Sequence, residues 1–459
     1  MNSVLHPSGE PLLLQIEKLV HGGAGLAHDG SRAVFVPHVL PGESVRVLLN
    51  RSRKGYAEAH LVEVVTPSPD RVSPPCPVYG RCGGCQLQHV ALDAQLRLKR
   101  EILAETLARV GGLGDLEVPP LIASPADFGY RNRARFAVFH TSSGSSLAYY
   151  EERSHRLVPI SECLLLSPLL NEILKHLNAL LPHAEQMGLQ EVSVAASLTT
   201  GEVVIHYCAE RATRQQAHAW FARVREGRPV KGQVLISGRG RQSRRWAEGD
   251  LTSAELIGGC RFRISEGAFA QANWKLNESL AKTVKNWALE GLAGLEGNAG
   301  LKVLELYAGI GNFGLLIARA GALVTLVEGN RTALADAREN ARFNHIGRCR
   351  FRAVSAEEIL TATTPGEYDL VLLDPPRTGL SKETVAGVLR LMPKRILYVS
   401  CDPPTLARDL RALQNAGYRI SRLQGYDMFP QTMHIETLVE LIRDVNGLVH
   451  EADVAPGQL

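Results

Sequence analysis

Apolar and amphipathic segments alternate regularly along the second half of the chain. Short apolar runs at 303–307, 323–328, 370–373 and 396–400 predict strands. Segments near 313–320, 331–343, 381–391 and 404–416 have helical periodicity and lie between or after these runs. This alternation predicts parallel strands in a doubly wound α/β sheet. Two further runs, 418–428 and 435–442, have no helix between them, which predicts an antiparallel hairpin at the sheet edge.

The first half of the chain has a different pattern. Residues 12–66 contain short β-rich runs separated by glycine and proline turns, which predicts a small β-barrel. Five prolines between 67 and 77 predict a linker. A helical pattern at 92–110 carries Lys99, and a mixture of strand and helix patterns follows it. We therefore divide the chain into a barrel at 1–66, a central α/β domain at 67–265, a doubly wound domain at 266–445 and a tail at 446–459.

Composition adds broad limits to this division. The 459 residues are 45% hydrophobic and 21% charged, which is ordinary for a soluble protein of two or three domains. No apolar run reaches the roughly 18 residues of a membrane span, and the first eleven residues lack a signal pattern. We expect a cytoplasmic protein without a membrane partner. The net charge of +4 permits a polyanionic partner without requiring one.

A glycine-rich turn follows the first strand of the doubly wound domain. Residues 305–314 read ELYAGIGNFG, and Gly309 and Gly311 allow a tight turn and the close approach of a ligand. Glu328 ends the next strand, where a carboxylate can accept hydrogen bonds from ribose hydroxyls. The plainer alternative is a structural turn, and the spacing to Gly314 also fits a dinucleotide site. The order of strand, turn, helix, strand and acid favours a nucleoside cofactor.

The sequence DPPRTG at 374–379 follows the strand at 370–373. Ligands bind at the carboxyl ends of strands in such sheets, so Asp374 is placed to touch the substrate. Enzymes that methylate exocyclic amines commonly have an aromatic residue after the two prolines, where it cradles a developing cation. Arg377 occupies that place here, which disfavours amine methylation.

Cys401 stands between a predicted strand and a predicted helix. A helix N-terminus stabilises an anion, so this position predicts a thiolate nucleophile, although many free cysteines are simply small buried side chains. Glu436 enters the last strand near the same edge, although a lone glutamate is usually a surface residue. A thiolate that adds to C6 of uracil makes C5 nucleophilic toward a methyl donor, and a base must then remove the C5 proton. Cys401 and Glu436 would supply these two functions.

Three of the eight cysteines are crowded together as Cys76, Cys82 and Cys85, with two glycines between the last two. Crowded cysteines in a reducing compartment indicate metal or redox chemistry. The spacing leaves zinc, an iron–sulfur cluster and a redox pair of Cys82 and Cys85 open, and it does not identify a fourth ligand.

The motifs of the chain occur together and in one order. They are Phe269-x-Gln271-x-Asn273, YAGIGNF at 307–313, DPPRTG at 374–379, SCDPxT at 400–405 and FPxTxHxE at 429–436. From about residue 12 to residue 442 the chain resembles the RNA uracil-C5 methyltransferases, in the branch with an N-terminal TRAM domain and an iron–sulfur cluster. The resemblance implies a Rossmann-like S-adenosylmethionine methyltransferase domain, an N-terminal OB-like TRAM barrel that binds RNA, and a central α/β domain carrying the iron–sulfur site. It also implies that residues 92–120 pack on the catalytic domain.

The resemblance assigns roles to individual residues. Cys401 matches the nucleophile, Glu436 the base, and Phe269 the ring that lies against the target base, while Asp374 can contact the uracil edge. Cys163 matches the fourth ligand of a [4Fe–4S] cluster with the three crowded cysteines. The positions that match the S-adenosylmethionine site are Gln271, Tyr307, Asn312, Glu328 and Asp374, with Gly309 and Gly311 in the turn.

The chain departs from the family at three positions. Glu305 stands where relatives often have aspartate, and Ala308 where they often have cysteine. Ser355 replaces an acidic residue that often contacts the adenine, with Glu357 close by, which puts one adenine contact in doubt.

The expected partner is RNA, and the expected chain is a monomer. Basic side chains bind the RNA backbone, and Trp246 or Phe269 can stack on unstacked bases, although any one basic cluster can also be a solvated loop. The basic candidates are Arg131 and Arg133, then Arg51, Arg53 and Lys54 in the barrel, and Arg239, Arg241, Arg244 and Arg245 beside Trp246.

Ribosomal RNA of the large subunit is favoured over the T-loop of transfer RNA, because relatives with both barrel and cluster act mostly on the former. Cytosine-C5 enzymes usually carry a second cysteine where Arg377 stands, so uracil is preferred. A non-catalytic iron–sulfur RNA-binding protein is a further alternative, and it would need neither Cys401 nor Glu436.

Overall fold

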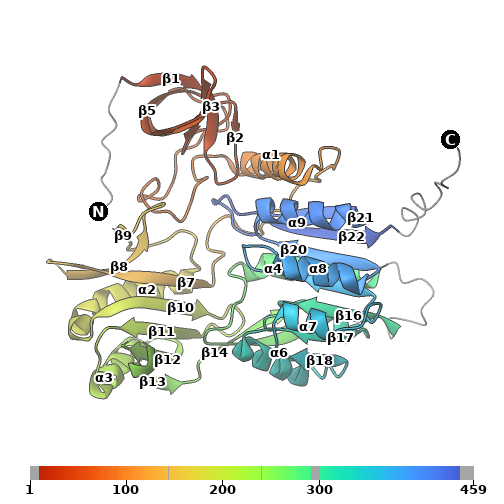
Figure 1. Ribbon diagram of the computed structural model, residues 1–459. Helices are drawn as coiled ribbons and strands as arrows, with labels where there is room; N and C mark the ends of the chain where they lie inside the picture. Colours follow the sequence, from red (N-terminus) through yellow and green to blue (C-terminus); the bar gives the residue numbers. More distant parts are fainter. Residues whose placement is uncertain (1–9, 143, 239, 291–299, 445–459) are drawn as a thin grey trace, which may run out of the picture.

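The computed structural model of the protein describes residues 10–142, 144–238, 240–290 and 300–444. The expected tail at 446–459 and Arg239 lie outside these ranges. The described residues form a barrel, a central α/β unit and a doubly wound unit, with one long helix, α1, below the barrel (Figure 1). None of the helices in these ranges combines the length and the apolarity that crossing a bilayer requires.

The N-terminal unit is a six-stranded sheet in the order β1-β5-β6-β4-β3-β2. Alternate residues such as Val34 and Val36 or Val45 and Val47 are fully buried, which closes a small apolar core inside the sheet. This confirms that the N-terminal unit is made of strands, as the sequence predicted. Its strands are β1 (Leu12–Gln15), β2 (Lys18–Leu19), β3 (Gly25–Asp29), β4 (Arg32–Val36), β5 (Ser44–Arg53) and β6 (Tyr56–Thr66).

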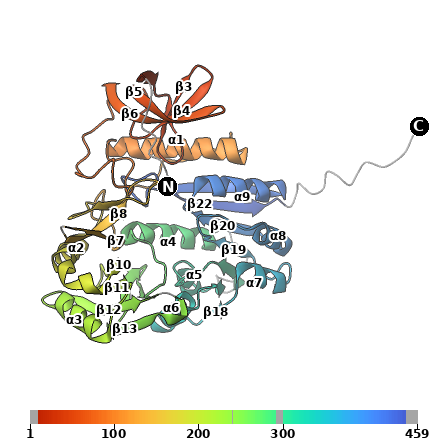
Figure 2. The same ribbon diagram turned by 60° about the vertical axis from the view of Figure 1, so that its left-hand side comes forward.

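Helix α1 (Leu92–Gly111) follows a linker at 67–91 in which the structure contains no helix or strand. The helix ends at Gly112, whose φ of 72° is the left-handed conformation that glycine adopts easily. Its buried side chains, among them Leu103 and Leu107, share one apolar core with Leu410 of a C-terminal helix, α9 (Pro403–Asn415). Both views place α1 between the barrel and α9 (Figures 1 and 2).

The central unit is a seven-stranded sheet in the order β13-β12-β11-β10-β7-β8-β9. Two helices cover one face of it, packing through residues such as Leu174 and Trp220. The elements are β7 (Arg133–Thr141), β8 (Gly144–Tyr150), β9 (Leu157–Pro159), α2 (Pro168–Leu180), η1 (Leu181–Met187), β10 (Leu189–Ala196), β11 (Val203–Ala209), α3 (Arg214–Arg225), β12 (Val230–Ser237), η2 (Gly240–Gln242) and β13 (Arg244–Gly249).

A separate hairpin, β14 (Thr252–Ile257) and β15 (Cys260–Ser265), connects the central unit to the doubly wound one. Its Phe262 and Ile264 are buried in the core of the doubly wound unit. The backbone of β15 also donates to the side chains of Asn340 at 2.7 Å and Asp336 at 2.6 Å, both on helix α6 (Arg331–Phe343). The hairpin therefore shares its core with the residues after it, whereas our division of the sequence assigned it to the central domain.

The C-terminal unit is a seven-stranded sheet in the order β18-β17-β16-β19-β20-β22-β21. The first five strands are parallel, and β22 lies antiparallel between β20 and β21, so the expected terminal hairpin is present. The elements are α4 (Trp274–Leu289), β16 (Lys302–Leu306), α5 (Gly314–Arg319), β17 (Leu323–Val327), α6 (Arg331–Phe343), β18 (Cys349–Arg352), α7 (Ala356–Ala362), β19 (Leu370–Leu373), α8 (Lys382–Leu391), β20 (Arg395–Ser400), α9 (Pro403–Asn415), β21 (Tyr418–Tyr426) and β22 (Glu436–Arg443).

This topology brings the catalytic candidates to one edge of the sheet. The parallel strands β16, β17, β19 and β20 all end at that edge, and the antiparallel strand β22 begins there. Ser400 at the end of β20 pairs with Thr437 at the start of β22. Cys401 and Glu436 therefore adjoin the same strand pair, although 35 positions separate them in the numbering.

Candidate active site

Glu436 is the most deeply buried of the predicted catalytic residues, with 2% of its surface exposed. Burial raises the pKa of its carboxyl to about 8; the Asp374 carboxylate raises this pKa further and the Arg377 guanidinium lowers it. A carboxyl group with a pKa near 8 can accept and return a proton close to neutral pH.

Cys401 lies beside these groups, and its thiol is protonated in the free protein. Burial raises the pKa of Cys401 to about 12, Glu436 adds to the rise and Arg377 opposes it. The expectation that the helix N-terminus lowers this pKa was therefore wrong. The physical reason is that burial of the thiol and the nearby Glu436 carboxylate outweigh the first turn of α9, which is already capped by Asp402, an acceptor from the amide (3.1 Å) and hydroxyl (2.9 Å) of Thr405.

Arg377 contributes more to the site than its place in the sequence indicated. It lies in the loop after β19, and its positive charge opposes the pKa rise of both Cys401 and Glu436. Its Nη2 lies 3.4 Å from Nε2 of His434. Burial lowers the pKa of His434 to about 4, with Arg377 adding to the fall, so this imidazole is neutral. Asp374, at the start of the same loop, has its pKa raised to about 7 by burial and by Glu328.

The glycine-rich turn is held by Glu328, the predicted ribose ligand. One carboxylate oxygen of Glu328 accepts from the amide of Gly309 at 2.9 Å, and the other accepts from the amide of Asn330 at 2.7 Å. Gly309 and Gly311 have φ values of 54° and 85°, in the left-handed region, which explains why glycine occupies both positions. Tyr307 has a φ of 62°, a conformation that costs a residue with a side chain about 1–3 kcal/mol and is typical of functional sites.

The other predicted cofactor residues surround this turn. The side-chain amides of Asn312 and Asn277, which lies on α4, donate a hydrogen bond to each other, at 3.0 and 2.9 Å. Asn312 therefore anchors the turn to α4. Gln271 is buried, whereas the Phe269 ring, two residues before it, is 73% exposed. Ser355 uses its hydroxyl to cap α7, and Glu357 accepts from Ser381 and Thr384.

Glu305 lies beneath the turn, and sequence reasoning gave it no role beyond a departure from the family. Burial raises the pKa of Glu305 to about 8, and one of its oxygens accepts from the amide of Gly314 at 3.1 Å. A Cβ at position 314 would lie 2.0 Å from the other oxygen, which leaves space only for glycine there. The side chain of Glu305, which is longer than the aspartate that relatives often have, therefore occupies the space that the missing Cβ of Gly314 leaves.

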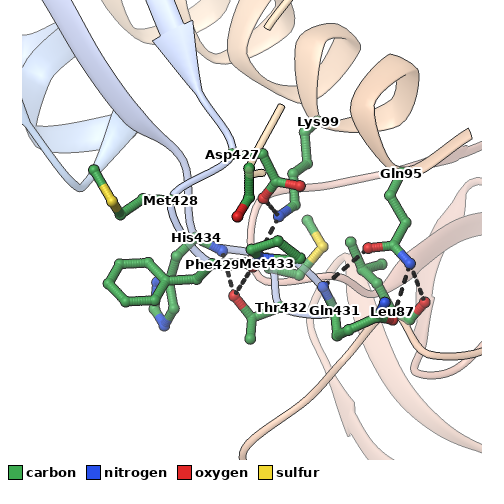
Figure 3. Close-up of polar contacts among 12 residues, drawn as sticks. Leu87, Gln95, Lys99, Asp427, Met428, Phe429, Gln431, Thr432, Met433 and His434 are labelled. Atoms are coloured by element: carbon green, nitrogen blue, oxygen red, sulfur yellow. Dashed lines mark hydrogen bonds and ion pairs between the residues drawn. The ribbon is translucent and has the colours of Figure 1, made fainter. Parts of the chain in front are cut away.

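The segment 427–435, here called the catalytic loop, connects β21 to Glu436 and is clamped by α1 (Figure 3). The fully buried Lys99 ammonium lies 2.5 Å from the Asp427 carboxylate and donates to the carbonyl of Phe429 at 3.1 Å. One turn earlier, Gln95 exchanges hydrogen bonds with Gln431, donating to its side chain and accepting from its backbone amide, both at 3.0 Å.

The backbone of the catalytic loop is strained at Gln431 and is held there from several directions. Gln431 has a φ of 69°, and its carbonyl accepts from the amides of Gln86 (3.0 Å) and Leu87 (2.9 Å). The hydroxyl of Tyr130 donates to Pro430 at 3.0 Å, and the amide of Asn273 donates to Met428 at 3.0 Å. Segments distant in sequence thus jointly fix the approach to Glu436.

Sequence reasoning missed Gln95 and Lys99 as contributors to the site. The signal was present, because both residues lie on the apolar stripe of α1, spaced i, i+4 and flanked by Leu98 and Ile102. A lysine on an apolar helix face is expected to have a buried partner, but the sequence does not identify that partner.

The barrel reaches the same site from the other side. Nε2 of His21, in the turn after β2, lies 3.6 Å from a carboxylate oxygen of Asp402. A Cβ at Gly23 would lie 2.6 Å from Cγ of Met433 in the catalytic loop. The barrel turn at 21–23 thus packs against residues next to both Cys401 and Glu436.

The four predicted cluster cysteines line one cavity of about 240 Å³, together with Arg131. Burial and the neighbouring cysteines raise the pKa of Cys85 to about 12. Among the residues that the structure describes, no three cysteine, histidine, aspartate or glutamate side chains converge to hold a single metal ion. The cavity is lined by Cys76, Cys82 and Cys85 from the linker and by Cys163 after β9.

The basic candidates fall into different environments. Arg53, Lys54 and Arg244 are exposed, and Arg245 pairs with Glu266 at 2.9 Å. Trp246 packs against the core of the central unit, which reduces the surface that it can offer to a base. The side chains of Arg51 and Arg241 and the whole of Arg239 lie outside what the structure describes. Arg131 and Arg133 are partly buried and line a cavity.

Comparisons with known proteins agree on one family. The family described as tRNA (Uracil-5-)-methyltransferase matches residues 91–444, and the TRAM domain family matches residues 8–62. The chain is 34% identical over 441 residues to the 23S rRNA (uracil(1939)-C(5))-methyltransferase RlmD of Shewanella amazonensis, covering 94% of this chain and 96% of that protein. It is 35% identical over 449 residues to the protein of the same name from Alkalilimnicola ehrlichii, covering 95% and 97%.

A solved structure is also similar over most of the chain. It is the Pyrococcus abyssi tRNA (uracil-54, C5)-methyltransferase in complex with S-adenosyl-L-homocysteine, at a TM-score of 0.73 and 26% identity. The match covers 94% of this chain and 100% of that one.

Proposed function

The chain belongs to the tRNA (uracil-5-)-methyltransferase family, and from this premise we propose that it methylates a uridine of 23S ribosomal RNA through a covalent adduct with Cys401. It is an S-adenosylmethionine-dependent RNA uracil-C5 methyltransferase. The observation that carries the mechanism is the placement of a nucleophile and a poised base, Cys401 and Glu436, beside one strand pair.

The turn at 307–312 and the carboxyl end of β17 supply the residues that would hold the cofactor. Glu328 fixes the turn through two amides and keeps lone pairs on both oxygens for ribose hydroxyls. S-adenosylmethionine supplies an electrophilic methyl group on a positively charged sulfur. Asp374, whose pKa is raised to about 7, lies at the same edge and gains a favourable partner when a cation binds nearby. Tyr307, Asn312 and Gln271 complete the proposed pocket.

The proposed reaction begins at Cys401. Its thiol releases its proton to the solvent as the sulfur bonds to C6 of the uracil, and the positive charge of Arg377 favours the thiolate form. The C5–C6 double bond opens, and C5 uses the resulting enolate electrons to take the methyl group, so that the cofactor leaves as the neutral thioether. The Phe269 ring, exposed at the head of its motif, would support the target base.

Glu436 completes the proposed reaction. Its carboxylate removes the C5 proton, the electron pair re-forms the C5–C6 double bond, and the C6–S bond breaks to release the Cys401 thiolate. A carboxylate with an ordinary pKa would be a weak base for this proton, whereas the pKa of about 8 brings Glu436 nearer to the working pH. The buried catalytic loop keeps this group away from water.

The choice of ribosomal RNA rests on the relatives. Both 23S rRNA enzymes are 34–35% identical to the chain over nearly their full length, whereas the transfer RNA enzyme of known structure is 26% identical. The transfer RNA T-loop remains the second candidate, because that enzyme shares the fold over 94% of the chain.

The choice is tested by offering unmodified 23S ribosomal RNA and unmodified transfer RNA, with radiolabelled S-adenosylmethionine, and mapping the methylated nucleoside. We expect 5-methyluridine at one site of 23S ribosomal RNA. Labelling of transfer RNA alone would contradict this choice of substrate.

We also propose that the four cysteines hold a [4Fe–4S] cluster. All four line one cavity, and the partly buried Arg131 guanidinium in the lining can balance the negative charge of a thiolate-bound cluster. Protein purified without oxygen should contain about four iron atoms and four acid-labile sulfides per chain. Zinc without iron or sulfide would contradict the proposal.

A further inference from the structure

A second cavity, of about 490 Å³, lies beside the exposed Phe269 ring and has no role in the reaction described above. One wall is the face of the central sheet that α2 and α3 leave uncovered. Side chains alternate across a strand, so Phe136 faces the helices while Arg133 and Arg135 face the cavity. Ile264 to Ala268, at the end of β15, form the opposite wall.

The cavity carries positive charge that the described residues do not balance. The Nε atoms of Arg131 and Arg133 are buried without a hydrogen-bond partner, and Arg133 forms no ion pair with a described residue. Burial lowers the pKa of Arg133 to about 10, although Glu255 opposes the fall. A buried charge without a partner is costly unless a ligand supplies the partner.

The acidic residues near the cavity are already engaged. Glu255 accepts from the amide of Leu198 at 2.9 Å, from Asn132 at 3.0 Å and from Thr199 at 3.1 Å. Glu266 lines the cavity, but its carboxylate lies 2.9 Å from Arg245 and 3.5 Å from His206. Arg135 is the other cavity arginine, and it is paired with Glu191. Arg131 also lines the cysteine cavity, whereas the Nε of Arg133 has no described hydrogen-bond partner, so its acceptor can come from a ligand.

The cavity adjoins the position proposed for the target base. The amide of Asn132 donates to the carbonyl of Ala272 at 3.1 Å, so the strand that carries the arginines is joined to the Phe269 motif. Ala268 lines the cavity, and Phe269 follows it directly. The Arg131 guanidinium also lies 5.5 Å from the centre of the Phe429 ring in the catalytic loop.

We infer that this cavity binds the nucleotide adjacent to the target uridine, with its phosphodiester held by Arg133. The inference rests on the proposed function and adds a second nucleotide site to it. The volume lies within the range of small-molecule sites, roughly 300–1,000 Å³. Arg133, which would bind the phosphate, stands beside apolar surface from Val194, Ile264 and Ala268, which suits an unstacked base. A uridine turned onto Phe269 would bring its neighbour to the mouth of this cavity.

The experiment measures binding of fluorescein-labelled octauridylate by anisotropy over a range of salt concentrations, without S-adenosylmethionine. Arg133→Met removes the charge and keeps most of the side-chain length, and Arg223→Met removes an exposed charge from α3 as the matched control. We expect Arg133→Met to weaken binding about tenfold and to reduce the salt slope by about 0.7, the value for one phosphate of a single strand. Arg223→Met should bind like the wild type.

Neutral methylphosphonate groups, placed at one linkage at a time, locate the contact. One linkage should weaken wild-type binding and have no further effect on Arg133→Met, because the two changes remove the same interaction. Arg133→Lys keeps the charge and should restore most of the salt slope. This variant also serves as the test if Arg133→Met does not fold. Thermal unfolding and S-adenosylmethionine binding are measured on each variant to confirm its fold.

Equal binding by Arg133→Met and the wild type, or additive effects at every linkage, would overturn the inference. So would an inorganic phosphate affinity equal to that of the octauridylate, because it would indicate a site for a free anion. The result is separable from the proposed function, since binding is measured without methyl transfer. If the protein does not methylate uridine but shows the linkage-specific loss of binding, the nucleotide site is supported and the proposed function is contradicted.

Discussion

Cys401 and Glu436 show which properties of single residues a sequence reveals. Their identities follow from the motifs around them and from their places at strand ends. Their protonation does not, because it depends on burial by segments far away in the chain, and the sequence-based expectation of a Cys401 thiolate was wrong for this reason. Tyr307 gives a second case: its motif marks the cofactor turn, but its positive φ is visible only in the folded chain.

Replacing the base should trap the reaction intermediate. In Glu436→Gln the C5 proton has no acceptor, so the adduct between Cys401 and ordinary uridine RNA should accumulate, and turnover should fall about 10²- to 10⁴-fold. Denaturing gel electrophoresis with labelled RNA measures the adduct. The double variant Cys401→Ala/Glu436→Gln should form none, and free product release by Glu436→Gln at the wild-type rate would show that another group is the base.

The pH dependence of adduct breakdown should reveal the raised pKa of Glu436, because this base acts after methyl transfer. The carboxylate is the active form and its pKa is about 8, so the active fraction is small at pH 6 and grows with pH. We expect the rate of breakdown of the methylated adduct, measured by rapid quench in a single turnover, to rise about tenfold per pH unit up to about pH 8. Arg377 favours the carboxylate, so Arg377→Met should move this rise to higher pH. A breakdown rate that does not change between pH 6 and 8 would contradict the assignment.

At the scale of elements, the periodicity of the sequence located four of the five parallel strands and the helices after them, and it predicted the terminal hairpin. It missed α4, α7 and β18, and it did not show that α1 clamps the catalytic loop. The helix pattern specifies which face of α1 is buried, but a buried lysine finds its partner only through tertiary packing. The Lys99–Asp427 pair joins segments 328 positions apart.

Breaking this pair on one side should be more harmful than removing it. Lys99→Met leaves Asp427 buried without a partner, and we expect the free energy of unfolding to fall by about 3–5 kcal/mol. Lys99→Met/Asp427→Leu removes both charges and should be less destabilised than the single variant. Urea unfolding measures both, and equal losses in the single and double variants would contradict the clamp as described.

At the scale of the whole molecule, the sequence predicted the separate units but not how they dock. Barrel, linker, α1 and catalytic loop meet around Met433, Gln431 and Asp402, and no local pattern encodes such a meeting (Figures 1 and 3). The hairpin β14–β15 shows the same limit, because its alternation predicts strands without showing which unit buries them.

Two neighbouring glycines of the barrel turn test the docking. Gly22 and Gly23 have φ values of 95° and 88°, so an alanine at either position carries a similar backbone cost of about 1–2 kcal/mol. Only at Gly23 does the new Cβ collide, with Met433, whereas Gly22 has no atom within 4 Å. Gly23→Ala should therefore lose about 1–3 kcal/mol more stability than Gly22→Ala in urea unfolding, and more activity. Equal losses would show that the turn does not press on the catalytic loop.

The covalent adduct is the central claim, and 5-fluorouridine tests it most directly. RNA containing this base is incubated with the protein and radiolabelled S-adenosylmethionine, and the denatured product is digested and analysed by mass spectrometry. Fluorine at C5 cannot leave as a proton, so a methylated RNA adduct should accumulate on the peptide that contains Cys401, and Cys401→Ala should give none. The absence of an adduct in the wild type, or its persistence in Cys401→Ala, would contradict the account.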